Sequence, residues 1–206
     1  MITNESSLPV TLSVTGYAWI SSLHEPQLKS TDEVIAFPAI FTLLPLQQQT
    51  LRVGVTAPVG AVERAYRVLV NELPTPAVRI NTKGLTIRVL SGFSVPVFLA
   101  PDTATMAPDL QNARITGGSF SVDLSNRGSA HLPPTSISIE VRDAAGHALW
   151  DHQGTAWYVL PGETRPISVK LPPTVCAAAR VVAVRAIAEG IDLRRQYSGI
   201  PISCRS

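Results

Sequence analysis

Polar and apolar residues alternate along much of this chain, and the longest alternation lies between residues 84 and 100. From 85 to 99 the odd positions read Leu-Ile-Val-Ser-Phe-Val-Val-Leu, so seven of the eight are apolar. One apolar face repeated every two residues is typical of a β-strand. At roughly 3.3 Å per residue this stretch would span about 50 Å, whereas an ordinary strand covers about 17–20 Å.

The rest of the chain is predicted to fold mainly as short strands separated by proline and glycine turns. These predicted strands are 10–19, 40–44, 51–55, 65–73, 119–124, 137–141, 167–171, 181–188 and 194–202. Residues 181–188 could be mistaken for helix, but their β-branched side chains favour a strand. This spacing of strands indicates β-sandwiches. We therefore predict an all-β protein with two domains, residues 1–100 and 101–206, joined near Ala100–Pro101.

The two cysteines, Cys176 and Cys204, each lie 14 residues from Gly190. The sequence between them reads as two strands that turn near this glycine. In a hairpin centred there, the cysteines would lie opposite each other at about 4.5–5.5 Å between Cα atoms, which suits a disulfide. We expect this disulfide, with two buried unpaired thiols as the alternative. A disulfide would place the protein outside the cytosol.

Composition and charge exclude several classes of protein. The chain has 206 residues, of which 45% are hydrophobic and 16% are charged, as in a globular protein. Its net charge of +2 is small and scattered, which argues against a nucleic-acid-binding face. No apolar run approaches the ~20 residues needed to cross a bilayer. The opening MITNESSLPV shows no leader peptide.

Candidate catalytic or metal-binding residues are sparse. His147 and His152 lie near Asp151 in HALWDH, but no Cys/His cluster or HExxH motif accompanies them, so we interpret them as surface residues. A hydrolase would depend on these three side chains alone. The Asp32–Glu33 pair is interpreted as a turn. We therefore predict no enzyme, no cofactor, no metal site and no small-molecule substrate.

Pro96 indicates how the long alternating strand is used. Proline cannot donate a ladder hydrogen bond, so Pro96 belongs on an edge strand or at a bulge, which Gly92 is suited to form. A long apolar edge invites aggregation unless something is meant to pair with it. We interpret residues 84–100 as a strand that accepts or donates pairing. The alternative is that it lies wholly in the core of its own domain.

Several stretches of the sequence together resemble a known family. IAFPAIFTLLPLQQQTLRVGV, ERAYRVLVNELP and GFSVPVFLAP resemble the amino-terminal domain of the periplasmic chaperones of the chaperone–usher pilus pathway. SFSVDLSNRGSAHLPPTSISIEV resembles early strands of their second domain. The likeness leans toward the archaic, Csu-type branch, because no lysine lies between Val89 and Pro101. It implies two immunoglobulin-like β-sandwich domains in an L or boomerang, and a periplasmic location.

The resemblance also implies a function in pilus assembly. Chaperones of this family lend their long strand to a pilus subunit whose own immunoglobulin-like fold lacks its final strand. They then deliver the subunit to an outer-membrane usher. A chaperone without a subunit could cover the apolar edge of this strand by self-association. In this sequence the subunit-binding side chains would be Leu85, Ile87, Val89, Phe93 and Val95.

A basic residue of the family anchors the terminal carboxylate of the subunit. A guanidinium suits this role because it can bind a carboxylate bidentately. Arg67, in AYRV, matches the position by resemblance, and Arg88 is the runner-up. The alternative is that Arg67 is an ordinary surface arginine on a strand.

The amino-terminal segment departs from the family pattern. Family members begin with a further strand before the one that starts here near Val10, and only ITNESSLP precedes it in this chain. We expect either an amino-terminal truncation or a first domain that lacks its first strand. The functional alternative to a chaperone is a two-domain immunoglobulin-like structural or adhesive module with no client.

Overall fold

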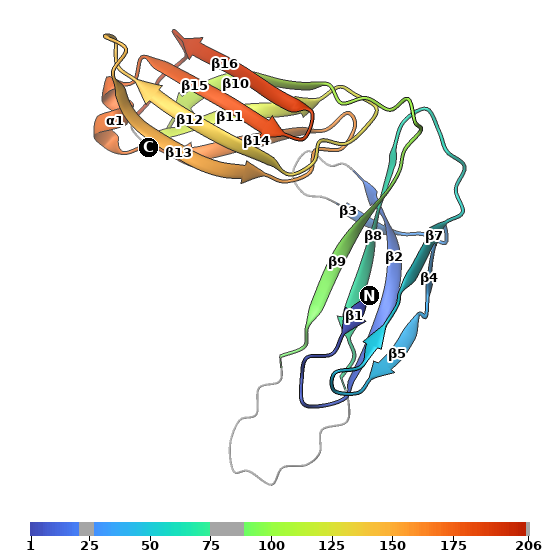
Figure 1. The fold of residues 1–206 in the computed structure, drawn as a ribbon. Coiled ribbons are helices and arrows are strands. Elements are labelled where there is room, and N and C mark those ends of the chain that lie inside the picture. The colour runs from blue at the N-terminus through green and yellow to red at the C-terminus, as the bar shows by residue number, and fades with distance from the viewer. Residues whose placement is uncertain (21–26, 75–88, 205–206) are drawn as a thin grey trace, which may run out of the picture. The chain divides into compact units, whose positions relative to one another are not determined.

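The computed structural model describes residues 1–20, 27–74 and 89–204. Within these ranges, sixteen strands and one short helix make up the regular structure, so the prediction of a nearly all-β chain is confirmed. The chain forms two compact units (Figure 1). Of the described residues, the first unit contains those up to Gly60 and Arg64–Leu99, and the second contains Ala61–Glu63 and those from Ala100 onward. The expected L-shaped arrangement of two domains stays a prediction.

The first unit is built around a sheet in which β2 is the central strand. The sheet has the order β3-β2-β8-β9, and β5 pairs with another part of β2. The bounds are Val10–Ile20 for β2, Gln27–Ser30 for β3, Ile40–Leu43 for β5, Arg64–Glu72 for β8 and Gly92–Leu99 for β9. Two small ribbons complete the unit: β4 (Val34–Phe37) with β7 (Arg52–Val55), and β1 (Ile2–Thr3) with β6 (Gln48–Gln49).

Alternating side chains of β2 and β8 form the core of the first unit. The buried members of this core are Leu12, Val14, Val34, Leu43, Tyr66, Val68 and Val70. Gly16 lies where β2 meets β4, and a Cβ atom there would lie 2.5 Å from Cβ of Val34. A glycine at this position therefore allows the two strands to approach each other closely.

The amino-terminal segment contains a short strand, β1. From the sequence we expected either a truncation or a first domain without its first strand. β1 pairs antiparallel with β6, with Ile2 opposite Gln49. Asn4, which is buried, donates from Nδ2 to the carbonyl oxygens of Leu8 at 2.9 Å and Leu43 at 3.0 Å. This buried amide ties the segment before β2 to β5, because both of its donor hydrogens are satisfied there.

The second unit is a sandwich of two antiparallel sheets. One sheet has the order β10-β11-β14 and the other β13-β12-β15-β16. The bounds are Pro108–Thr116 for β10, Ser119–Asn126 for β11, Thr135–Arg142 for β12, Ala148–Ala156 for β13, Thr164–Lys170 for β14, Val181–Ala188 for β15 and Ile191–Ser198 for β16. Between the sheets lies an apolar core that includes Phe120, Val122, Ile139 and Val184.

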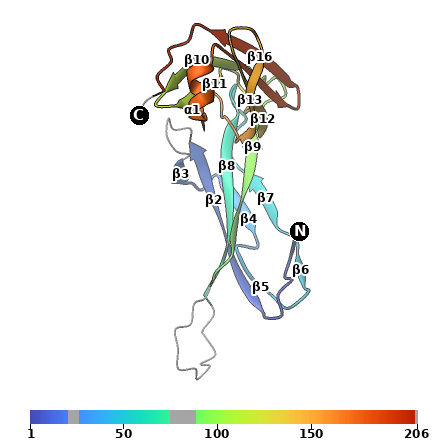
Figure 2. The ribbon, with the colours of Figure 1, turned by 90° about the vertical axis from the view of Figure 1, so that its left-hand side faces the viewer.

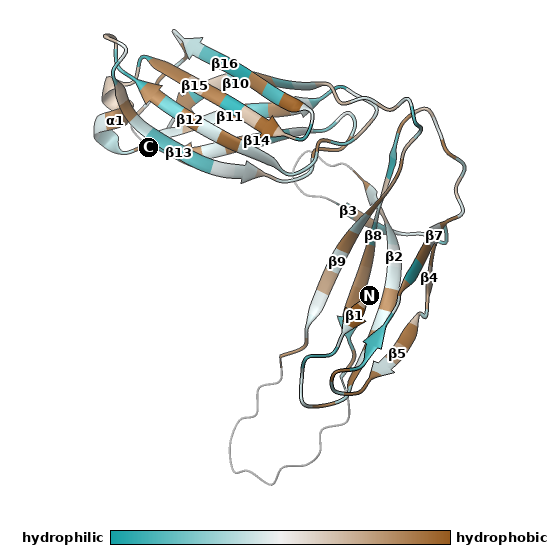
Figure 3. Ribbon diagram, viewed as in Figure 1, coloured by the Kyte–Doolittle hydropathy of each residue, from teal (hydrophilic) through white to brown (hydrophobic). Residues whose placement is uncertain are grey.

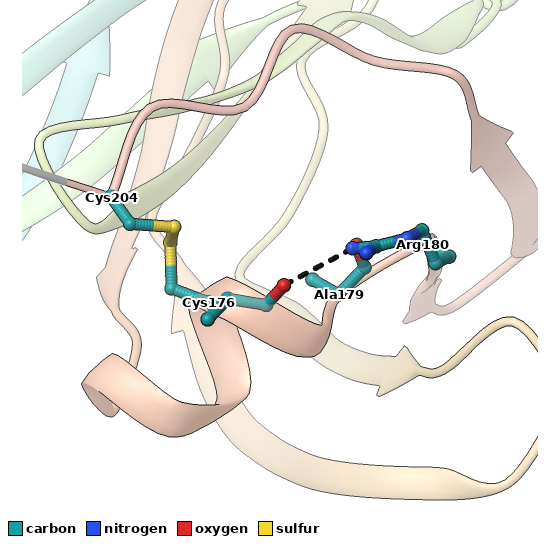
Figure 4. Close-up of a disulfide and its surroundings, with 5 residues drawn as sticks. Cys176, Ala179, Arg180 and Cys204 are labelled. Carbon is teal, nitrogen blue, oxygen red and sulfur yellow. Dashed lines mark hydrogen bonds between the residues drawn. A yellow bond between two sulfur atoms is a disulfide. The ribbon is translucent and has the colours of Figure 1, made fainter.

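Cys176 and Cys204 form a disulfide with 5.9 Å between their Cα atoms (Figure 4). The predicted hairpin geometry is wrong, however. β15 and β16 do turn next to Gly190, with Ala188 opposite Ile191, but neither cysteine lies in their ladder. Cys176 is on the helix α1 (Pro173–Ala178), and Cys204 follows the last strand. The bond therefore joins a helix to the carboxyl-terminal segment.

The end of α1 is stabilised by an arginine that follows it. Arg180 donates from Nη1 to the carbonyl oxygens of Ala177 at 3.1 Å and Ala179 at 2.6 Å, and Figure 4 draws Arg180 beside Ala179 at the end of the helix. A cation placed there satisfies carbonyl groups that have no partner within a helix. The helix stops before β15, so residues 181–188 form the strand that their β-branched side chains predicted.

Candidate functional site

β9 lies at the edge of the first unit's large sheet. It pairs antiparallel with β8 from Arg64 opposite Leu99 to Asn71 opposite Gly92, and the two strands run side by side in Figures 1 and 2. Among the described residues, no other strand pairs with β9. Pro96 lies within it, opposite Arg67. The position of proline on an edge strand agrees with the sequence-based prediction, because its missing N–H does not break an interior ladder.

The odd-numbered residues of β9 lie on the core-facing side of the sheet. Residues opposite each other in a ladder share a face, and Phe93 and Val95 are opposite the buried Val70 and Val68. Yet Phe93 is 47% exposed and Val95 is 43% exposed. Figure 3 shows brown, hydrophobic segments in both β8 and β9, next to paler and more polar ones. The core-facing side of this edge strand is therefore left uncovered near its amino-terminal end.

The regular strand is shorter than the predicted stretch 84–100. β9 begins at Gly92, and one further backbone hydrogen bond joins Glu72 N–H to the oxygen of Ser91 at 2.9 Å. Val89 lies outside any strand and is 82% exposed. The predicted site residues Leu85 and Ile87, and the runner-up anchor Arg88, lie outside the described residues.

Arg67 lies in the middle of β8, on the opposite face from the core. Its Cζ atom is 3.8 Å from the ring centroid of Trp19 on β2, and the rings of Trp19 and Phe98 lie 6.1 Å apart. Arg67 is 9% exposed and Trp19 is 4% exposed. The alternative of an ordinary surface arginine is therefore wrong. This cation–π contact holds the guanidinium plane, in which all of its N–H bonds point.

Trp19 was not identified as a site residue from the sequence. It ends an alternating segment, VTLSVTGYAW, whose last residues gave no separate signal. Trp19 supports the side chain of Arg67 from the neighbouring strand because Tyr17 of β2 lies directly opposite Arg67, and residues two apart on a strand share a face. Only the pairing of β2 with β8 brings the two side chains together.

Glu33, which the sequence analysis interpreted only as part of a turn, binds two residues at the start of β8. Glu33 Oε1 accepts from Arg64 Nη1 at 3.0 Å, and Glu33 Oε2 accepts from the hydroxyl of Tyr66 at 2.7 Å. Burial and the hydrogen bond to Glu33 raise the pKa of Tyr66. This small network orders the start of the strand that carries Arg67.

His147 and His152, the candidate catalytic or metal-binding histidines, contact different partners and do not form a common site. His147 Nδ1 lies 3.2 Å from Asp143 Oδ2 in the β12–β13 turn, and the ring of His152 stacks on that of Trp150 at 5.6 Å. Asp151 lies opposite Glu140 on the neighbouring strand. In the parts of the chain that the structure describes, no group of three or more His, Cys, Asp or Glu side chains could hold a metal ion. Those parts of the chain also contain no helix long and apolar enough to span a membrane.

Comparison with known proteins shows the family. Residues 1–105 match the family described as "Pili and flagellar-assembly chaperone, PapD N-terminal domain". The chain belongs to this family. Pilus-assembly chaperones are not enzymes, and this agrees with the prediction of a non-catalytic protein. No curated protein sequence matches the chain.

Several solved structures of fimbrial chaperones have a fold similar to that of this chain. A structure of the CsuC–CsuE chaperone–tip adhesion subunit complex of Acinetobacter baumannii matches with a TM-score of 0.60 and 15% identity, covering 97% of this chain and 88% of that chain. The complex of Salmonella enterica SafA pilin with the SafB chaperone gives 0.56 and 16%, covering 95% and 86%. The class 5 fimbriae chaperone CfaA gives 0.56 and 11%, covering 96% and 90%. These matches confirm the predicted immunoglobulin-like fold.

Proposed function

We propose that this protein is a periplasmic chaperone that binds pilus subunits by donor-strand complementation and delivers them to an outer-membrane usher. The observation that carries the proposal is the uncovered edge of β9. The backbone groups of β9 that point away from β8 have no partner strand among the described residues, and Phe93 and Val95 remain about half exposed on the same strand. An edge of this kind is suited to add a strand to another sheet.

Two kinds of contact would hold the subunit. Backbone hydrogen bonds would extend from the unpaired side of β9, while alternate side chains would fill pockets in the subunit. Full burial of one such apolar side chain is worth roughly 1.5–3 kcal/mol. We propose that Phe93 and Val95 act in this way, together with Val89 and, upstream, Leu85 and Ile87. The cost of association offsets part of this gain.

We further propose that Arg67 anchors the terminal carboxylate of the subunit. Its Cζ atom lies over the ring of Trp19 at 3.8 Å from the centroid, so less side-chain entropy would be lost on binding than for an arginine without this contact. A guanidinium can bind a carboxylate through two parallel hydrogen bonds. Arg88 remains the runner-up for this role.

Similar solved complexes, one feature of the sequence and the disulfide support the proposed clients, family branch and location. The complexes named above pair a chaperone with a tip adhesion subunit or a pilin, which makes pilus subunits the proposed clients here. The absence of lysine between Val89 and Pro101 supports placement in the archaic, Csu-type branch. The disulfide supports a periplasmic location, because disulfides persist in oxidising compartments.

Co-expression tests this function. The protein, exported behind a leader peptide, is produced with the pilus subunit encoded nearest to it, and the complex is purified through a tag on the subunit. We expect a one-to-one complex that is lost in Phe93→Asp and Val95→Asp. Ser94→Asp is the matched control, because Ser94 lies between them on the opposite face of β9 and is also exposed.

The same experiment distinguishes a chaperone from a structural or adhesive module with no client. If both aspartate variants stay folded by circular dichroism but lose the subunit, the edge of β9 is a binding edge. If the unsubstituted protein is folded and retains no subunit, the donor-strand proposal is wrong. A self-contained structural or adhesive module then becomes the better explanation.

A further inference from the structure

The outer face of the second unit's four-stranded sheet contains a polar hollow of about 580 Å³. Its position follows from the register of three strands. Ala183 on β15 lies between Glu140 on β12 and Gln196 on β16. The neighbouring rows place Arg185 and Arg142 around the same alanine. A small side chain surrounded by long polar ones leaves a depression with Ala183 as its floor.

Two arginines on one side of the hollow are held together by a shared carboxylate. Arg185 and Arg194 lie directly opposite each other on β15 and β16, a placement in which like charges repel. Asp192 offsets this repulsion. It accepts from Nε and Nη2 of Arg185 at 2.8 and 3.0 Å, and from the same atoms of Arg194 at 3.2 and 3.0 Å. The two guanidiniums hold the pKa of Asp192 far below its usual range.

The charges around the hollow are unevenly distributed. Arg185 and Arg194 share the carboxylate of Asp192, and Arg195, which also lines the hollow, is paired with Asp109 of β10. One positive charge of β15 and β16 is therefore left without a carboxylate partner. On the other side, Arg142 Nε donates to Glu140 Oε1 at 2.6 Å, and Asp151 lies opposite Glu140 on β13. Glu140, Asp151 and Arg142 together leave one excess negative charge toward β12 and β13, and the positive excess lies over β15 and β16.

We propose that this hollow binds a phosphate group, seated over β15 and β16 at the guanidinium donors of Arg185 and Arg194 that Asp192 does not use. Each guanidinium has five N–H donors, and Asp192 occupies the Nε–Nη2 edge, which leaves the Nη1 donors of both side chains for a second anion. Ser138 lies opposite Arg185 and, like Gln196, lines the hollow, adding uncharged donors.

Several features favour a small phosphate-bearing ligand over a protein partner or a carboxylate. The volume of about 580 Å³ lies within the range of small-molecule pockets, about 300–1,000 Å³. The donors of the hollow come from three strands, β12, β15 and β16, and from both charged and uncharged side chains. A tetrahedral phosphate has enough acceptor oxygens to use them together, and arginine is especially suited to phosphate. This site is independent of the proposed chaperone function and implies binding without turnover.

Calorimetric titration with inorganic pyrophosphate at low ionic strength tests the proposal, with amide shifts in NMR spectra to locate the site. We expect saturable binding with the largest shifts on β15 and β16. Arg194→Gln should weaken it roughly 10-fold to 100-fold, because a charge-assisted hydrogen bond is lost. Ala183→Leu should weaken it without any change of charge, because it fills the floor. Glu140→Gln should tighten it.

Arg114→Gln is the matched control, because Arg114 is an exposed arginine on β10 in the other sheet of the same unit. Unchanged affinity in this variant is expected. Equal weakening in Arg114→Gln and Arg194→Gln, or no effect of Ala183→Leu, would overturn the proposal in favour of non-specific attraction of anions. The absence of saturable pyrophosphate binding would overturn it as well.

The source of the phosphate is distinguished by flotation with vesicles. Vesicles of phosphatidylglycerol are compared with vesicles of phosphatidylcholine, using the intact protein and Arg194→Gln. Retention on phosphatidylglycerol that Arg194→Gln abolishes would identify a lipid headgroup. Pyrophosphate binding without such retention would identify a soluble phosphate compound.

Discussion

The guanidinium of Arg67 stacks on the indole ring of Trp19, with its Cζ atom 3.8 Å from the ring centroid. The two residues come from adjacent strands and are both buried. An arginine held in this way keeps its charge, because the guanidinium does not lose its proton in proteins. The contact therefore holds a permanently charged group, the one that we propose as an anchor, over the ring of Trp19.

Arg67→Ala is expected to weaken binding of a pilus subunit by roughly 2–5 kcal/mol, because it removes one partner of a desolvated charge pair. Arg67→Lys should restore only part of this loss, since a lysine cannot form the bidentate pair. Surface plasmon resonance against an immobilised subunit measures both. Arg52→Ala, an exposed arginine on β7, is the control. Equal affinities for Arg67→Ala and the unsubstituted protein would exclude Arg67 as the anchor.

Gly16→Ala is expected to destabilise the first unit by about 1–3 kcal/mol, the usual range for overpacking. The new methyl group would lie 2.5 Å from Cβ and 2.6 Å from Cγ1 of Val34. Chemical denaturation measures the loss. Adding Val34→Ala should recover part of it, because the two positions are in contact and their effects are then not additive. Gly54→Ala, which meets no atom within 4 Å, serves as the control for the loss of a glycine.

Replacing both cysteines, Cys176→Ser with Cys204→Ser, is expected to lower the free energy of unfolding by about 2–4 kcal/mol. The disulfide closes a loop with a sequence separation of 28 and ties α1 to the carboxyl-terminal segment. Hydrogen exchange should show faster opening of α1 and of the pairing between Ile115 and Ile202. Protection of β2 and β8 should not change. Loss of protection throughout both units would contradict this local role.

Stability is expected to fall between about pH 10 and 12 through Tyr197. Burial raises the pKa of Tyr197 to about 12, and its hydroxyl donates to the oxygen of Leu110 at 2.9 Å. Between an unfolded pKa near 10 and this folded value, the folded state binds more protons, so unfolding becomes easier as pH rises. The stabilisation is complete below the unfolded pKa and is lost through the folded one.

Tyr197→Phe tests this pH dependence. The variant should be less stable than the parent near neutral pH, because the Leu110 carbonyl loses its donor, and it should lose less stability between pH 10 and 12. Thermal melts across this range measure both effects. Parallel curves for the two proteins would show that Tyr197 is not responsible.

Local patterning was sufficient to predict most of the strands. Alternation in 10–19, 65–73 and 181–188 corresponds to β2, β8 and β15, because a strand with one buried face imposes a period of two. β10 was not predicted, because its register shifts between Gln111 and Arg114 and this shift breaks the alternation of polar and apolar residues. β13 was not predicted either, because it is an edge strand and several of its residues are polar.

The site could be predicted only in part. Pro96 marked an edge strand from sequence alone, since the lack of an N–H is a local property. The exposure of Phe93 and Val95 depends on how far the core extends beneath β9, which no single segment specifies. The placement of Leu85 and Ile87 as subunit-binding residues stays a prediction.

By itself, then, the sequence determined the all-β class, most of the strands and the family resemblance, because these follow from patterns within a few residues or from matching motifs. Tertiary structure decided which side chains meet. It placed Cys176 on a helix rather than in a hairpin, set Trp19 beneath Arg67 and put Ala183 at the centre of a ring of polar residues. Each of these depends on cross-strand register or on chain segments far apart in sequence, which local alternation does not encode.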